Sequence, residues 1–275
     1  MTELRLEGVR FDYPGGVRAL DGVDLVIRPG ERVALVGQNG SGKTTLVRHL
    51  DGLLRPTAGR VLVGGVDAAG LTVARLARTV GLAFQDPDSQ VFASSVRAEV
   101  SFGPRNVGLR GATLQAAVDW ALESVGLAGE AATNPFDLGV SRRKLLTIAS
   151  VLAMGTPVVI LDEPTTGQDL RGVLRIESIL DGLTAQGRTV IAITHDLRFA
   201  AERFDRIVGM RAGKMILDGP PETVFAASAW PALRTTWLEP PLPALVGERL
   251  GLGSTPTDES LVAAVGSTGG AALSG

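Results

Sequence analysis

Residues 37–45 read GQNGSGKTT, and this stretch limits the possible folds more than any other part of the chain. It matches the pattern G-x-x-x-x-G-K-[ST] and lies between an apolar run, RVALVG, and a segment with helical spacing, KTTLVRHLDGLL. In that context the glycines let backbone N–H groups turn inward around phosphates, and the helix start adds its dipole. Lys43 is predicted to reach the β- and γ-phosphates, and Thr44 to offer its hydroxyl to Mg²⁺. The sequence therefore predicts a phosphate-binding loop between a buried strand and a helix.

Further apolar runs alternate with helical segments along the chain. Besides RVALVG, the predicted buried strands are VGLAFQD, TPVVILDEP and RTVIAITHD. A helix is predicted over 172–186, and residues from about 88 to 155 are helical in character. Buried strands that alternate with helices are typical of a parallel sheet. We therefore predict an α/β core with an inserted α-helical subdomain at about 88–155.

Other segments have the pattern of antiparallel strands. Residues 3–11 and 23–28 alternate apolar and polar side chains, as in a half-buried sheet. Residues 59–70 and 206–219 are each predicted to form a hairpin. We therefore expect antiparallel β-structure in addition to the parallel sheet.

The end of the chain has a different composition. It becomes rich in proline (LEPPLPALV), and from about residue 266 it contains mainly small residues, for which we predict disorder. We expect a main domain over 1–240 and an extension over 241–275. Two tryptophans lie near this boundary, and we expect them to pack in the core, with a protein interface as the alternative: Trp230 and Trp237.

Polar residues with catalytic potential follow three of the predicted strands. Asp162 and Glu163 end one strand, Gln85 ends another, and His195 ends a third. The carboxyl ends of parallel strands are where ligands bind in such sheets. Asp162 suits a metal-holding role, and Glu163 would polarise an attacking water, a contribution of about 10²–10⁴-fold to the rate. These residues are predicted to gather around the terminal phosphate.

Composition excludes several classes of function. The net charge is −2, so a basic field for nucleic acid is missing, and no nucleic-acid partner is expected. There are no cysteines, which excludes a disulfide framework. No apolar run approaches the length of a membrane span, and the N-terminus lacks a signal peptide. We expect a cytoplasmic enzyme or binding protein.

The segment NPFDLGVSRRKLLTIAS, residues 134–150, has an unusual charge pattern. Ser141 is predicted to cap a helix, because serine is a favoured N-cap. The first turn would then hold Arg142, Arg143 and Lys144, where the helix dipole is already positive. These cations are either a solvated face or part of a site for an anion.

Together these motifs resemble the ATP-binding subunit of an ATP-binding cassette (ABC) transporter. The stretch FQDPDSQVFASSV, residues 84–96, is similar to the Q-loop region of the energy-coupling-factor and cobalt-type importer branch, and the resemblance covers roughly 3–240. It implies a P-loop NTPase (RecA-like) core with an antiparallel β subdomain, an inserted helical subdomain and a short C-terminal extension. It also implies ATP and Mg²⁺ as cofactors, and ATP hydrolysis that drives import of a vitamin or transition metal.

The resemblance also implies a role for each motif residue. Asp169 would be the acid of the D-loop, and Tyr13, the only tyrosine, would stack on adenine. The implied catalytic residues are Glu163, His195, Gln85 and Lys43. The implied nucleotide-binding residues are Tyr13, Gly37, Asn39, Gly40, Ser41, Gly42, Lys43, Thr44 and Thr45. The implied metal-holding residues are Thr44, Gln85 and Asp162.

The signature motif departs from the family pattern. In the family, Leu-Ser-Gly-Gly-Gln completes the ATP site of a partner subunit, but this chain has LGVSR at that place: Leu138, Gly139, Val140, Ser141 and Arg142. The serine hydroxyl that would contact phosphate is therefore missing. If it acts like an oxyanion-hole donor, its loss costs about 10²–10³-fold in rate. Either Ser141 or Arg142 could compensate.

The resemblance implies two kinds of partner. One is a second ABC ATPase subunit, and we favour a heterodimer over a homodimer because this chain's own site has its full set of residues. The other is an integral membrane component that docks on residues 92–106, where Phe92, Val96 and Phe102 are the apolar candidates. The protein would then be peripheral on the cytoplasmic face of the membrane.

Three alternative functions remain open. The first is a soluble ABC ATPase that acts on DNA or ribosomes, although the chain has neither a coiled-coil insertion nor a second cassette. The second is a P-loop kinase or GTPase, although no guanine-reading Asn-Lys-x-Asp is present. The third is a regulatory subunit that binds ATP and turns over slowly, which the altered signature favours.

Overall fold

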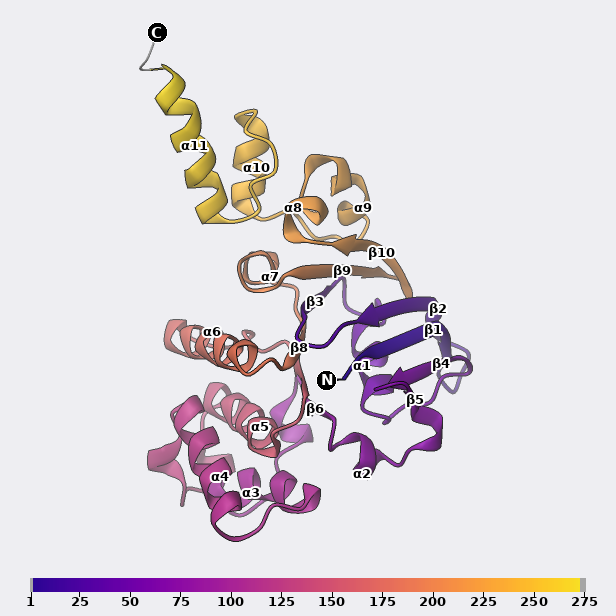
Figure 1. Cartoon of the computed structure of the whole chain (residues 1–275), viewed down its shortest axis with the longest axis vertical. Helices are drawn as coiled ribbons and strands as arrows, with labels where there is room; N and C mark the ends of the chain where they lie inside the picture. Colours follow the sequence, from indigo (N-terminus) through magenta and orange to yellow (C-terminus); the bar gives the residue numbers. More distant parts are fainter. Residues whose placement is uncertain (1, 273–275) are drawn as a thin grey trace.

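A six-stranded sheet forms the centre of the computed structural model, which describes residues 2–272 (Figure 1). Its strand order is β10-β9-β3-β8-β7-β6; all neighbours are parallel except the antiparallel pair β10 and β9. The middle strands are apolar and buried along their length, as expected for a sheet covered on both faces. The bounds are β3 (Arg32–Val36), β6 (Val80–Ala83), β7 (Val158–Asp162), β8 (Thr189–Ile193), β9 (Arg206–Arg211) and β10 (Lys214–Gly219).

A separate four-stranded antiparallel sheet has the order β2-β1-β4-β5. Burial along β1 alternates, so one face is apolar and packs inward. The helix α1 (Lys43–Leu50) contributes Leu46, Val47 and Leu50 to the core between the two sheets. The predicted antiparallel region is confirmed, with strands β1 (Leu4–Asp12), β2 (Arg18–Ile27), β4 (Ala58–Val63) and β5 (Val66–Asp67).

Three helices form the predicted helical subdomain, on one side of the central sheet in Figure 1. They are α3 (Val96–Val107), α4 (Gly111–Val125) and α5 (Val140–Met154), which pack against one another. Short elements link them to the core: α2 (Val73–Leu76) precedes β6, and the 3₁₀ turn η2 (Pro87–Ser89) follows it. The helices α6 (Leu170–Ala185) and α7 (Leu197–Arg203) follow β7 and β8. The alternation of strand and helix is thus the one predicted.

The C-terminal region differs from the expectation in two respects. The predicted disorder from about residue 266 is wrong up to Ala272, because α11 continues to that residue; 273–275 lie outside the described part. Acidic residues in the first turn of α11 suit the helix dipole, and Leu261 and the alanines that follow have high helix propensity. The helices of this region are α8 (Pro221–Val224), α9 (Trp230–Arg234), α10 (Leu242–Arg249) and α11 (Asp258–Ala272).

The second difference concerns the two tryptophans, which have unlike environments. The Trp230 indole N–H donates to the Phe225 carbonyl at 2.8 Å, and its ring is half-buried. Trp237 is 80% exposed, so the prediction of core packing is wrong for this residue. No helix within residues 2–272 is both long enough and apolar enough to cross a membrane.

Candidate nucleotide site

The loop between β3 and α1 is held close to neighbouring backbone. A Cβ at Gly37 would collide with the carbonyl oxygen of Met210, and one at Gly42 would lie 2.5 Å from the carbonyl oxygen of Ala19. Both glycines also have positive φ, at 146° and 106°. Side chains are therefore excluded at these two positions, and the loop can present its backbone N–H groups.

Lys43 lies inside this loop and is almost fully buried. Its ammonium donates to the carbonyl oxygens of Gly37 at 2.6 Å and Gln38 at 3.0 Å. Burial lowers the pKa of Lys43, while the nearby carboxylates of Asp162 and Glu163 oppose that shift. The lysine is thus positioned as a cation on the phosphate side of the loop.

Asp162, at the end of β7, is the residue best suited to hold a metal ion. Thr44 Oγ1 donates to its Oδ2 at 3.2 Å, and burial raises the pKa of Asp162 to about 6. Its Oδ1 is buried and, within residues 2–272, has no hydrogen-bond partner. A buried acceptor without a donor fits a cation at this point. The same part of the chain has no cluster of three or more His, Asp or Glu side chains that could bind a metal.

Glu163 has a constrained backbone and a fixed carboxylate. Its φ is 51°, in the left-handed region that non-glycine residues rarely adopt. Its Oε2 accepts from His195 Nδ1 at 2.8 Å and from Thr166 Oγ1 at 3.1 Å. Glu163 is buried, whereas the His195 side chain is 61% exposed. His195 therefore reaches from the surface to the carboxylate.

Most of the predicted nucleotide and catalytic residues line a single cavity of about 350 Å³. Those that line it are Tyr13, Asn39, Gly40, Ser41, Gly42, Lys43, Thr44, Thr45, Gln85, Asp162 and Glu163. The strand β6 ends two residues earlier than predicted, and Gln85 follows it in an exposed loop. Gly37 and His195 do not line the cavity but contact Lys43 and Glu163, which do.

Tyr13 lines the cavity and directly follows β1 of the antiparallel sheet. Its hydroxyl shares a hydrogen bond of 3.1 Å with Thr45 Oγ1, and the Phe11 ring meets its ring edge-on at 4.9 Å between centroids. These two contacts fix the plane of the phenol ring. A fixed aromatic face in this position suits a flat base.

The signature segment lies elsewhere, at the start of α5. None of its five residues lines the cavity described above. The predicted N-cap at Ser141 is wrong: α5 begins at Val140, and Gly139 is the N-cap, with no side-chain hydrogen bond. Ser141 instead donates from Oγ to Gln168 Oε1 at 2.8 Å. Ser141 therefore lies within the first turn of α5, one residue after Val140, and its hydroxyl proton is directed to another element.

The three cations of this turn all have partners in their own chain. Arg142 forms an ion pair with Glu130, and Arg143 Nε lies 3.2 Å from Asp88 Oδ1. The latter geometry is too bent for a hydrogen bond, so we regard it as an ionic contact only. Lys144 is buried, and its ammonium donates to the Thr166 carbonyl at 3.1 Å. Of the two alternatives for these cations, a solvated face is therefore excluded for Lys144, and the turn contacts the segments that contain Asp88, Glu130 and Thr166.

Sequence reasoning missed two residues near Glu163. Thr166 holds the Glu163 carboxylate, and Lys144 holds Thr166. Thr166 follows the acidic pair closely in sequence, which could have suggested a contact. No sequence pattern indicates the Lys144 contact, because the two residues lie on separate elements.

Comparison with known proteins identifies the family. The family model described as ABC transporter matches residues 20–166. The chain is 42% identical over 239 residues to a putative ABC transporter ATP-binding protein of Methanosarcina acetivorans, covering 87% of this chain. It is 40% identical over 242 residues to the cobalt import ATP-binding protein CbiO of Rhodobacter capsulatus, covering 87% of this chain and 85% of that protein. The chain spans only 39% of the Methanosarcina protein and 43% of a similar one from Caldanaerobacter subterraneus.

Solved structures agree with this relationship. The structure of cbiO1 from Clostridium perfringens, part of the ABC transporter complex cbiONQ, has a TM-score of 0.73 and 35% identity, covering 90% of this chain and 98% of that one. A dimeric post-hydrolysis state of the ATP-binding cassette MJ0796, bound to ADP and Pi, has a TM-score of 0.73 and 25% identity, covering 79% of this chain and 98% of that one. The chain therefore belongs to the ABC transporter family, and the proteins that it is similar to include a cobalt import ATP-binding protein.

Proposed function

We propose that this chain hydrolyses ATP to drive a membrane importer of the energy-coupling-factor type, which takes up a vitamin or a transition metal. One observation carries the proposal: Lys43, Asp162 and Glu163 converge on one cavity beneath a glycine-rich loop. Similarity to the cobalt import protein CbiO supports the importer branch. The cargo would be selected by a separate membrane component.

Each residue of the site has a separate role in this proposal. Lys43 and the loop N–H groups bind and orient the phosphates, and Tyr13 stacks on the adenine. Thr44 and Asp162 would hold Mg²⁺, which would supply charge neutralisation at the phosphates. Glu163 is oriented by His195 and accepts a hydrogen bond from a water molecule that lies in line with the terminal phosphate.

A second ATPase subunit completes the site in our proposal, and we favour a non-identical one. The chain's own cavity has all its catalytic groups, whereas its signature turn lacks the usual serine. The hydroxyl of Ser141 and the guanidinium of Arg142 bond within the chain. Neither of the two proposed substitutes is therefore free, which favours a partner with an intact signature. Similarity to a dimeric cassette supports dimerisation itself.

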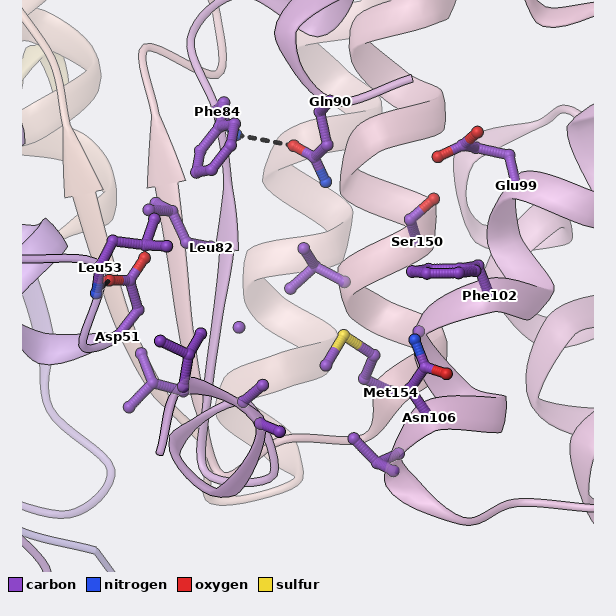
Figure 2. A pocket seen from close by; sticks show the side chains of 18 of the residues that line it. Asp51, Leu53, Leu82, Phe84, Gln90, Glu99, Phe102, Asn106, Ser150 and Met154 are labelled. Carbon is purple, nitrogen blue, oxygen red and sulfur yellow. Dashed lines mark hydrogen bonds between the residues drawn. The ribbon is translucent and has the colours of Figure 1, made fainter. Parts of the chain in front are cut away.

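A groove of about 590 Å³ is the proposed docking place for the membrane component. Figure 2 shows it between α3, α5 and the segment after α1, with Phe102 and Met154 on one side and Asp51 and Leu53 on the other. Phe92 and Phe102 are 59% and 49% exposed and meet edge-on at 4.8 Å between ring centroids.

Exposed aromatic rings beside an apolar groove suit a helix from a membrane protein, which would hold this chain at the membrane surface. Val96 is fully buried, so its predicted place on the docking surface is wrong. The first turn of α3 directs Val96 into the core, whereas Phe92 precedes the helix and lies at the surface.

Turnover measurements test this function. Mg-ATPase activity of the chain alone is compared with that of the chain purified together with its partners from native membranes. We expect activity mainly in the complex, with kcat lowered about 10²–10⁴-fold by Glu163→Gln. Equal activity of the chain alone would contradict the need for a partner. Low turnover in both samples despite tight ATP binding would favour the regulatory alternative.

A further inference from the structure

The start of α5 contacts, in two places, the loop of the same chain that follows Glu163 and ends at α6. Lys144 Nζ donates to the Thr166 carbonyl at 3.1 Å. One turn earlier, Ser141 Oγ donates to Gln168 Oε1 at 2.8 Å, and Gln168 Nε2 donates back to the Ser141 carbonyl at 3.1 Å. These contacts join the signature turn to the residues that directly follow Glu163.

The Gln168 side chain, which contacts Ser141, occupies a space beside α6. The Gln168 side chain lies over Gly172 of α6, where a Cβ would collide with Gln168 Oε1. Glycine at position 172 therefore leaves room for the Gln168 amide in the orientation that serves both hydrogen bonds to Ser141.

Thr166 transmits the first contact to the catalytic carboxylate. Its carbonyl accepts from Lys144, and its hydroxyl donates to Glu163 Oε2 at 3.1 Å. The same oxygen accepts from His195 Nδ1 at 2.8 Å. A single series of hydrogen bonds therefore runs from α5 through Thr166 and Glu163 to His195.

The positive charge of Lys144 interacts with the carboxylates of Glu163 and Asp162. Lys144 is buried, and it lines the same small internal space as Asp162 and Pro164. Burial lowers the pKa of Lys144, and the two carboxylates oppose that shift. The carboxylate pair thus lies among two buried lysines, Lys43 from the phosphate loop and Lys144 from α5.

We propose that Lys144 and Thr166 are positioning residues that set the orientation of Glu163 in the same chain. This inference rests on the proposed catalytic role of Glu163. The signature turn then has a second role, because it supports its own chain's site besides facing a partner's nucleotide. The left-handed backbone of Glu163 leaves its carboxylate dependent on such external contacts.

Two substitutions with a matched control test the inference kinetically, in the assembly that hydrolyses ATP. Thr166→Val removes the hydroxyl and keeps the shape, and Lys144→Met removes the ammonium and keeps the length. Each should lower kcat about 10-fold with KM for ATP within about twofold, since hydrogen bonds to charged groups are among the stronger ones. Thr166→Ser should retain kcat within about twofold. The control is Thr184→Val, whose hydroxyl bonds only Leu180 within α6, and it should match the wild type.

The double variant Thr166→Val with Lys144→Met distinguishes one pathway from two. Because both residues belong to one series of contacts, the kcat of the double variant should equal that of the single variant with the lower kcat. If the fold-reduction of kcat in the double variant equals the product of the two single fold-reductions, the residues act independently, and the single series of contacts is contradicted. An unchanged kcat in both single variants, while Glu163→Gln abolishes turnover, would overturn the inference and leave the proposed function intact.

A spectroscopic measurement tests the contacts independently of turnover. The chain has two histidines, so selective ¹⁵N-histidine labelling of the full chain yields signals from His49 and His195 only. Thr166→Val and Lys144→Met should shift the ring nitrogens of His195, because Glu163 moves relative to them. His49, buried near Phe11 and bonded to the Thr45 carbonyl at 2.7 Å, should not change. Unmoved His195 signals in both variants would overturn the inference even if no ATP is hydrolysed.

Discussion

The phosphate loop and the signature turn both lie at the start of a helix, but only the phosphate loop lines the cavity of about 350 Å³. In the phosphate loop, Lys43 and the backbone face a cavity, and glycines keep side chains away. At the start of α5, the side chains of Ser141, Arg142 and Lys144 bond to the chain itself. Lys43 also bonds to carbonyl oxygens of its own loop, but it lines a cavity, whereas none of the five signature residues lines that cavity.

This difference shows what a departure from a family motif can mean. In the phosphate loop every residue type required for phosphate binding is present, so its function can be inferred from the motif. In the signature turn the residue types differ from the family motif, and Ser141 and Arg142 have partners within the chain. The function of this turn therefore cannot be inferred from the motif alone.

Restoring the missing hydroxyl gives the largest expected effect. A Cβ at Gly139 meets no atom within 4 Å, and φ there is −62°, so Gly139→Ser fits without strain. If the signature limits turnover, Gly139→Ser should raise kcat of the chain alone about 10²-fold. Steady-state ATPase assays of the isolated chain measure this change.

A matched glycine provides the control for that substitution. Gly129 lies in the same subdomain and is equally open, so Gly129→Ser should leave kcat unchanged. If Gly139→Ser gives no gain over this control, the two helix starts differ in more than one hydroxyl. Val140, 62% exposed in place of a family glycine, would then be the next residue to change.

A buried charge at the end of α1 gives the next largest effect. Asp51 is buried in the groove of about 590 Å³, and burial raises its pKa to about 6, above the ordinary 3.8. The folded state thus binds this proton more tightly than the unfolded state, so the free energy of unfolding falls as pH rises between about 4 and 6. Asp51→Asn keeps an acceptor for the Leu53 N–H and should stabilise the protein at pH 7 by about 1–3 kcal/mol, given about 1.4 kcal/mol per pKa unit.

Urea denaturation at pH 4 and pH 7 measures this effect. The gain from Asp51→Asn should be near zero at pH 4 and full at pH 7. The exposed Asp137, changed to Asn in parallel, serves as the control and should change stability little at either pH. A gain at pH 4 as large as that at pH 7 would contradict an ionisation effect.

The paired charges of α5 give the smallest effect. Arg143→Gln removes the ionic contact with Asp88, whose side chain is 58% exposed, and the hydrogen bond from Arg143 Nη1 to the Phe136 carbonyl, so the expected loss of stability is about 1–2 kcal/mol. Arg97→Gln, which removes an exposed pair with Asp119, should cost less. Thermal unfolding of both variants tests this order. A loss of several kcal/mol for Arg143→Gln would mean that the pair behaves as a buried one.

The nucleotide site could be predicted closely because its signals are local. A glycine-rich loop between a strand and a helix specifies its own geometry, and Asp162 and Glu163 follow directly from the apolar run of β7. Parallel strands then bring their carboxyl ends to the same edge. The catalytic residues could therefore be placed together without knowledge of other contacts.

The signature turn could not be predicted in the same way, because its partners are distant in sequence. Ser141 fits the local rule for an N-cap, but α5 begins one residue earlier, at Val140, and the Ser141 hydroxyl donates to Gln168 of another element. The burial of Lys144 depends on the packing of α5 against the loop after β7. The prediction for Trp237 is wrong for a similar reason, since an apolar residue type does not specify whether the rest of the fold covers it.

The backbone of Glu163 has a consequence for how this protein evolves. Its φ of 51° costs a non-glycine residue about 1–2 kcal/mol. A glycine at this position would relieve that cost, but it would also remove the hydrogen bonds that Glu163 Oε2 accepts from Thr166 and His195. In our proposal the position therefore combines a cost in backbone free energy with a carboxylate that the activity needs.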